Sequence, residues 1–224
     1  MSDTPLPDKK QMAIKLRKFN RICPITGYKE ESIKIGAPVV VQTDRGAEFG
    51  EIIVYRHGLP RSVAQDVRLK KVLRYATAED LSKVRSLSDL ETKGKHLAAQ
   101  KAAEHELPIK IVNVEYLFDI SKAVVYYKVA EGKSVKNLRD YMRDVSTALE
   151  ARVTLRQVSP RDEARLLGGL GSCGRQLCCS VWLEKPKHVT VKMVKEQGLQ
   201  ISPTKTSGIC GRLMCCLEYE YVKK

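Results

Sequence analysis

The chain has 224 residues, of which 43% are hydrophobic and 29% are charged, a composition that excludes a wholly disordered protein. Its 40 Lys and Arg residues outnumber 26 Asp and Glu residues, and the net charge of +14 favours an acidic partner such as RNA, DNA, an anionic membrane surface or an acidic protein. No apolar run approaches the roughly 20 residues of a membrane span, and the first residues lack the apolar core of a secretory signal. A cytoplasmic location is therefore expected.

The N-terminal part of the chain predicts a basic arm followed by a small β structure. Residues 1–30 are polar and basic and are expected to form a flexible arm. The β-branched residues of 35–43, turn residues at 44–46 and a second run at 47–55 predict a hairpin, part of a small twisted sheet or open barrel. Residues 67–76 predict another strand.

A long helical segment follows. Thr77 and Asp80 have the spacing of a capping box, which predicts a helix beginning at residue 77. The segment is expected to be one helix weakened at Gly94, or two helices that meet there, and Pro108 ends it. Apolar residues at three-residue spacing support the helix: Leu81, Val84, Leu87 and Leu90.

The next segment predicts a β-β-α-β unit. Residues 109–118 and 122–129 have strand composition, and 151–158 predicts a third strand. Ser134 is expected to cap the helix between them. The helix has one apolar stripe, formed by Val135, Leu138, Met142, Val145 and Leu149.

The predicted fold class is therefore α+β, with an N-terminal hairpin or small barrel, a long helical segment, a β-β-α-β unit and a cysteine-rich C-terminal lobe that binds metal. The expected segments are the arm at 1–30, a β-rich subdomain at 31–76, the helical segment at 77–108, the α+β subdomain at 109–160 and the cysteine-rich lobe at 161–220. Within this lobe, residues 189–197 predict a short helix that Gly198 stops.

The lobe contains the pattern G-x-C-G-R-x-x-C-C twice, at 171–179 and at 208–216. The two copies contain six of the seven cysteines: Cys173, Cys178, Cys179, Cys210, Cys215 and Cys216. Thiolates gathered in one place need a cation, and soft thiolates select zinc, copper(I) or iron–sulfur clusters. In a reducing cytosol, metal binding is also more typical of clustered cysteines than disulfides are.

The spacing C-x₄-C-C leaves two kinds of metal open. Zinc could bind through the pairs Cys173/Cys178 and Cys210/Cys215, whereas the wide spacing favours an iron–sulfur cluster. Glycines would let the backbone curl around a cluster and direct N–H groups at its sulfides, and arginines would offset its charge. The residues expected in these cofactor-binding roles are Gly171, Gly174, Arg175, Gly208, Gly211 and Arg212.

Other interpretations stay open. The cysteines could be small buried hydrophobic residues, or vicinal pairs could form a thiol redox switch. A zinc-stabilised module could bind nucleic acid through the basic surface, with Tyr126 and Tyr127 stacking on bases. His188 could be a ligand, although a surface histidine is the more ordinary expectation. No pattern of a nucleophile with its base, and no Walker loop, is present, so an enzyme is not indicated.

Several stretches resemble one known family. The cysteine motifs with their flanks at 169–183 and 202–220, the segment 191–195 and the first hairpin at 39–50 are similar to the RicT (YaaT) family. The similarity extends over nearly all of 36–219, whereas the opening of the chain around Cys23 departs from the family pattern.

The resemblance implies a non-enzymatic cytoplasmic regulator that joins RicA (YlbF) and RicF (YmcA) proteins. The family's ternary complex carries 4Fe–4S clusters and adjusts RNA processing by the endonuclease RNase Y; in sporulating bacteria it also affects sporulation, competence and biofilm formation. The resemblance makes all six clustered cysteines candidate cluster ligands.

Overall fold

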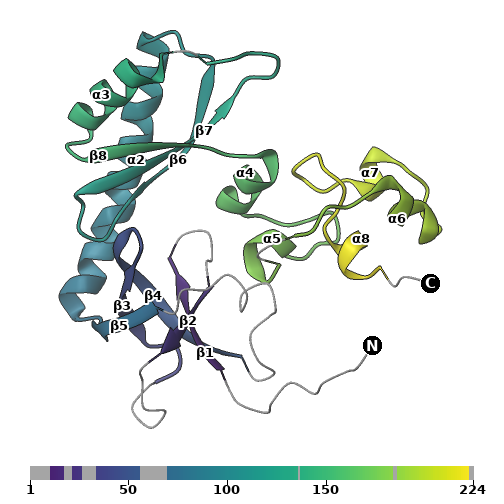
Figure 1. Cartoon of the computed structure of the whole chain (residues 1–224), viewed down its shortest axis with the longest axis horizontal. Coiled ribbons are helices and arrows are strands. Elements are labelled where there is room, and N and C mark those ends of the chain that lie inside the picture. The colour runs from purple at the N-terminus through teal and green to yellow at the C-terminus, as the bar shows by residue number, and fades with distance from the viewer. Residues whose placement is uncertain are drawn as a thin grey trace. The chain divides into compact units, whose positions relative to one another are not determined.

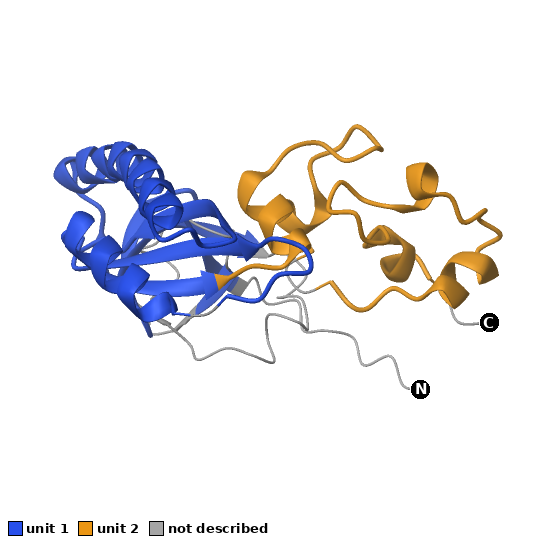
Figure 2. Cartoon of the chain, turned by 90° about the horizontal axis from the view of Figure 1, so that it is seen from above, with its two compact units in different colours: residues 1–156 blue, residues 157–224 orange. Residues whose placement is uncertain are grey.

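The computed structural model describes residues 11–17, 22–26, 34–55, 70–135, 137–183 and 186–221. The chain divides into two units, residues 1–156 and 157–224, coloured separately in Figure 2. Within the described ranges, no helix combines the length and the apolar composition that crossing a membrane requires.

The first unit begins with a five-stranded closed barrel (Figure 1). Its strands are β1 (Gln11–Leu16), β2 (Ile22–Thr26), β3 (Pro38–Thr43), β4 (Gly46–Tyr55) and β5 (Lys70–Tyr75). They lie in the order β1-β2-β5-β3-β4, with β3 and β4 forming the predicted antiparallel hairpin. The strand predicted near 67–76 is confirmed as β5, because its described residues pair with β3.

The prediction of a flexible arm over 1–30 is wrong for β1 and β2. Strand β1 pairs antiparallel with both β2 and β4. The alternate residues Met12, Ile14 and Leu16 are buried in the barrel core, and the small, buried Ala13 and the basic Lys15 lie between them. The basic composition concealed this apolar alternation, which is the signature of a half-buried strand. The rest of the predicted arm lies outside the described residues.

One continuous helix, α2 (Ala78–Glu104), connects the barrel to the rest of the unit. The predicted capping box is confirmed, because Thr77 and Asp80 each accept a hydrogen bond from the other's backbone N–H. Gly94 does not break the helix. It is buried, and a Cβ there would lie 3.2 Å from a Leu149 methyl group and 3.4 Å from the Tyr116 ring, so glycine permits close packing.

The three-residue spacing in α2 did not identify its buried face. Leu87 is buried, but Leu81 and Leu90 are 39% and 37% exposed. Three residues turn an α-helix by less than one full revolution, so a strict three-residue spacing drifts around its surface. The buried face continues instead through Ala98 and Ala102.

The predicted β-β-α-β unit is present as β6 (Ile109–Tyr116), β7 (Lys122–Val129), α3 (Leu138–Ala148) and β8 (Arg152–Gln157). The strands form a sheet in the order β6-β7-β8. Ser134 does not cap α3: the N-cap is Asn137, which adopts a left-handed conformation (φ 62°) without a side-chain cap. Asparagine tolerates that conformation better than most residues.

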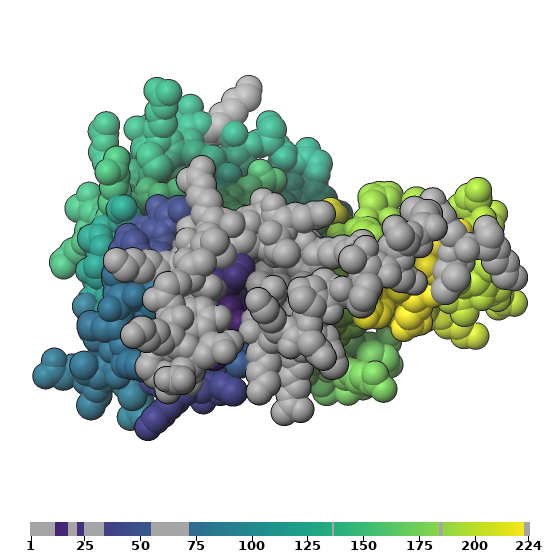
Figure 3. All heavy atoms as spheres, turned by 60° about the horizontal axis from the view of Figure 1, so that its bottom comes forward, coloured from purple at the N-terminus to yellow at the C-terminus, as the bar shows by residue number. Residues whose placement is uncertain are grey.

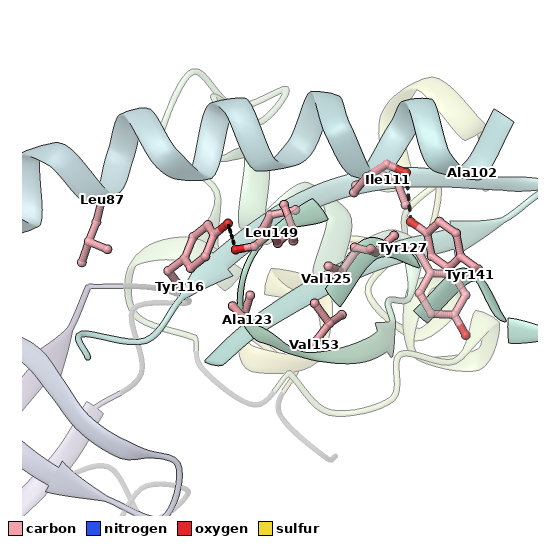
Figure 4. Packing of buried hydrophobic residues seen from close by; sticks show 14 residues of the cluster. Leu87, Ala102, Ile111, Tyr116, Ala123, Val125, Tyr127, Tyr141, Leu149 and Val153 are labelled. Carbon is pink, nitrogen blue, oxygen red and sulfur yellow. Dashed lines mark hydrogen bonds between the residues drawn. The ribbon is translucent and has the colours of Figure 1, made fainter. Parts of the chain in front are cut away.

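The core of this region lies between α2, α3 and the sheet (Figure 4). Two buried tyrosines anchor the helices through their hydroxyl groups: Tyr141 donates to the Ala98 carbonyl at 3.0 Å, and Tyr116 donates to the Leu149 carbonyl at 3.3 Å. Burial raises the pKa of Tyr141 to about 12. Both phenols therefore serve as hydrogen-bond donors within an otherwise apolar core.

A buried ionic network joins the barrel to the β6–β7 strands. Arg45, between β3 and β4, donates to Glu48 at 2.7 Å and to both carboxylate oxygens of Glu115 at 3.2 Å. Tyr126 donates to Glu115 at 2.6 Å, and Thr43 donates to Glu48 at 3.0 Å. Glu48 and Glu115 are 7% and 6% exposed, so the guanidinium compensates two carboxylates that are shielded from water.

This network also overturns the prediction that strand tyrosines stack on bases. Tyr126 is fully buried and Tyr127 is 8% exposed, so neither presents a ring to a ligand. Burial, together with the neighbouring Glu115 carboxylate, raises the pKa of Tyr126, so its hydroxyl stays protonated as a donor.

The part of the second unit that the structure describes contains five short helices: α4 (Pro160–Leu167), α5 (Cys178–Val181), α6 (Val191–Glu196), α7 (Pro203–Thr206) and α8 (Cys216–Tyr219). A small core of Val189, Val194 and Leu217 holds α6 against α8, and their yellow-green and yellow atoms adjoin in Figure 3. The helix predicted near 189–197 is confirmed as α6. Sequence reasoning missed α4, which begins with a capping box between Ser159 and Asp162.

We expect Arg45→Met to lower the free energy of unfolding of the first unit by about 3–5 kcal/mol, because it leaves Glu48 and Glu115 buried without a cation. Urea unfolding followed by circular dichroism measures this. The control Lys101→Met removes the exposed Lys101–Glu104 pair and should cost less than about 1 kcal/mol. Equal effects of the two substitutions would contradict the role assigned to Arg45.

A pH dependence follows from Asp80. Its carboxylate accepts hydrogen bonds from Arg74 and from the Thr77 N–H, and these partners hold the pKa of Asp80 well below its usual value. The stabilisation is therefore complete above the unfolded-state pKa of about 3.9 and is lost as the pH falls below it. The stability difference between wild type and Asp80→Asn should be largest near neutral pH and narrow below about pH 4. Asp89→Asn, on an exposed position of α2, should show no such trend in urea midpoints.

Candidate metal centre

The two cysteine motifs form the same backbone loop. In the first, the Gly171 N–H donates to the Arg175 carbonyl at 2.8 Å; in the second, the Gly208 N–H donates to the Arg212 carbonyl, also at 2.8 Å. An isolated bridge accompanies each loop, Leu170 with Gln176 and Ser207 with Leu213. The sequence repeat is therefore a structural repeat.

Glycine is required at two matching positions of the loops. Gly174 and Gly211 have φ values of 76° and 73°, a left-handed conformation that side chains disfavour. Their N–H groups donate within the loop, to the carbonyls of Gly171 and Gly208 at 3.0 and 2.9 Å. These two glycines shape the turn on which Cys173 and Cys210 are carried.

The repeats also contact each other. Trp182 and Tyr219 occupy matching positions, and their rings meet edge to face with centroids 4.6 Å apart. The Ser172 hydroxyl lies 3.7 Å from the Met214 sulfur, which joins the motifs a second time. The connecting segment thus brings the two motifs together.

All six clustered cysteines line one cavity of about 70 Å³. Gly171 and Gly208 line it too, and a Cβ on them would lie 3.5 Å from the Cys173 sulfur and 3.7 Å from the Cys210 sulfur. The missing side chains therefore leave space beside these two sulfurs. Cys23, by contrast, is buried in the barrel of the first unit.

The cysteines in the cavity are free thiols that influence one another across the repeats. Burial raises the pKa of Cys179, and negative charge on Cys210 raises it further. Burial likewise raises the pKa of Cys215 and Cys216, and charge on Cys178 adds to both effects. Ionising several of these thiols together is therefore unfavourable unless a cation joins them.

Helix α4 supplies cations that sequence reasoning did not assign to the site. Arg161 lines the cavity, and its Nη2 donates to the Leu213 carbonyl at 3.3 Å. Its Nε is buried and has no hydrogen-bond partner in the described part of the chain. The charge of Arg161 lowers the pKa of Cys215, and that of Arg165 lowers the pKa of Cys179, both against the larger effect of burial.

The arginines of the two cysteine motifs, unlike Arg161, do not line the cavity. Arg175 and Arg212 are exposed and are not among the residues lining the cavity, so their expected role beside a cluster stays a prediction. His188 is exposed as well and does not line the cavity. A capping box in Ser159-Pro160-Arg161-Asp162 could have revealed α4, but no pattern in the sequence connects that helix to the cysteines.

The chemical type of the side chains at the cavity suits a thiophilic metal, but their arrangement is not that of a metal site. Among the described residues, no three Cys, His, Asp or Glu side chains are arranged as ligands of one metal ion. The chemistry is nevertheless that of a soft-metal site: six thiols border one space, and a cationic donor there lacks an acceptor. Binding would require the thiols to converge.

The raised thiol pKa values give a test of the redox-switch interpretation. In metal-free protein at pH 7, iodoacetamide should modify exposed Cys173 faster than Cys179, Cys215 and Cys216, because the thiolate is the reacting form. Raising the pH to about 9 should accelerate the slow sites. Mass spectrometry of peptides sampled over time measures each rate. Rapid modification of all three at pH 7 would instead favour a reactive thiol switch.

Comparisons with known proteins identify the family of this chain. The family model "PSP1 C-terminal conserved region" matches residues 70–158, and "PSP1-like protein, third domain" matches 188–223. The chain is 41% identical over 184 residues to stage 0 sporulation protein YaaT of Bacillus subtilis (strain 168). That alignment covers 81% of this chain and 65% of the relative. No solved structure matched. The chain belongs to the PSP1-domain proteins and is a homologue of YaaT.

Proposed function

We propose that this protein is a non-enzymatic cytoplasmic regulator whose C-terminal lobe holds a 4Fe–4S cluster within a complex that modulates RNA processing by RNase Y. The observation that carries the proposal is the single cavity bordered by all six repeated cysteines. Its homology to YaaT adds the link to sporulation that the relative's name states. The chain spans 65% of that relative's length, so activity and partners are part of the proposal.

The chemistry of the cavity supports a cluster. A cubane cluster takes four thiolates, and thiols of both motifs border the cavity, so Cys173, Cys178, Cys179, Cys210, Cys215 and Cys216 include enough ligands. When bound, the cluster would supply an electron-accepting or structural centre whose potential depends on its surroundings. Gly171 and Gly208 leave room beside the sulfurs, and Arg161 places positive charge at the wall of the cavity.

The proposed role is that of an adaptor. RicA (YlbF)-like and RicF (YmcA)-like proteins would be its partners, RNase Y its target, and the net charge of +14 would permit a weak hold on RNA. In a sporulating host the complex would act in sporulation, competence and biofilm formation. The sequence shows no catalytic constellation, which agrees with regulation through binding rather than catalysis.

The deciding experiment is metal analysis of protein purified without oxygen, alone and together with RicA-like and RicF-like partners. We expect iron and sulfide in near-equal amounts and broad visible absorption. Cys210→Ser should lose most of this absorption, because it removes a cavity thiol. Cys23→Ala should retain it, because Cys23 lies in the barrel of the other unit.

Other outcomes would assign the cavity differently. Stoichiometric zinc without colour would indicate a zinc-stabilised lobe, and salt-dependent binding of RNA by that zinc protein would make it a nucleic-acid-binding module. Absence of any metal, even with the partners present, would contradict the proposal.

A further inference from the structure

The guanidinium group of Arg161 is held at the cavity in an unusual way. One end, Nη2, donates to the Leu213 carbonyl at 3.3 Å, which ties α4 to the second motif. The Nε–H is removed from solvent and has no acceptor among the described residues. A buried donor without an acceptor is unfavourable, and unsatisfied buried groups in native proteins call for an explanation.

The surroundings of Arg161 identify the missing acceptor. Arg161 shares its cavity with the six clustered cysteines and with Ala164, one turn along the same helix. A metal–thiolate centre is anionic and rich in sulfur lone pairs, and N–H donors to its sulfurs are the usual outer partners of such centres. A guanidinium fixed by Leu213 can therefore direct its Nε–H at this group without further ordering.

We infer that Arg161 is a positioning residue of the metal centre, which donates its Nε–H to a cysteine or inorganic sulfur atom of the bound group and balances its negative charge. This inference rests on the proposed function for the identity of the group, but the donor would serve any thiolate-bound metal. It also assigns to α4 the charge-balancing role that the sequence motif suggested for Arg175 and Arg212.

The test compares wild type with Arg161→Gln, Arg161→Lys and the control Lys205→Gln, which removes an exposed cation of the same unit. Each protein is reconstituted anaerobically with ferrous iron and sulfide. Loss of iron to EDTA and the reduction potential are then measured. We expect Arg161→Gln to retain iron about tenfold less well, as loss of an outer partner of a metal site does, and to have a lower potential. Lys205→Gln should behave as wild type.

Folding is followed separately through Trp182, the single tryptophan, whose contact with Tyr219 reports on the lobe in the metal-free protein. If Arg161→Gln disturbs that signal, the inference is tested with Arg161→Lys instead, because this variant keeps the positive charge but lacks Nε. Incomplete iron retention by Arg161→Lys supports the directed hydrogen bond. Full retention would overturn it, as would wild-type behaviour of a folded Arg161→Gln.

Failure of the proposed function can be told apart from failure of this inference. If the wild type takes up no iron, either alone or with the RicA-like and RicF-like partners present, the iron–sulfur proposal falls, and the same four proteins are titrated with Zn²⁺ against a chromophoric chelator. Weaker zinc binding by both Arg161 variants, but not by Lys205→Gln, would still support Arg161. Equal zinc affinities across the four proteins would overturn the inference.

Discussion

Six thiols around one small space are the constraint on which the second unit depends. Burial makes Cys179, Cys215 and Cys216 harder to ionise, and negative charge on neighbouring thiols adds to this effect. In the described part of this unit, the apolar cluster formed by Val189, Val194 and Leu217 is small. The free energy of binding a cation to deprotonated sulfur is large enough to organise a small lobe of this kind.

The first unit is stabilised by different means. Its helix and sheet enclose a continuous apolar core, and the barrel is attached through Arg45, Glu48 and Glu115 rather than through apolar contact alone. A bidentate guanidinium–carboxylate pair fixes orientation as well as distance. These contacts give the first unit a defined internal geometry.

The extent to which sequence predicted this structure can be traced to particular residues. Some local signals were reliable: the capping box at Thr77 gave the start of α2, and strand composition gave β6 and β7. Signals masked by composition failed, as in β1, where lysine interrupts the apolar residues. Contacts between distant parts of the chain could not be predicted from sequence. The environment of Tyr126, for example, is formed by Glu115 from the neighbouring strand and by Arg45 from the barrel.

Sequence likewise predicted one part of the candidate site and not another. The repeated motif predicted which cysteines would gather, because the same nine-residue pattern folds into the same loop twice. It could not predict the contribution of α4, because Arg161 precedes the first motif and reaches the cavity through a contact with Leu213 in the second.

The duplicated loop has a consequence for biosynthesis. A ribosome releases the first motif well before the second, and N-terminal units fold first during synthesis. In that interval the residues of the barrel, α2 and the β6–β8 sheet have already been synthesised, but only three of the six cysteines that line the cavity are present. The cavity that both motifs border can therefore form only after the second copy has emerged.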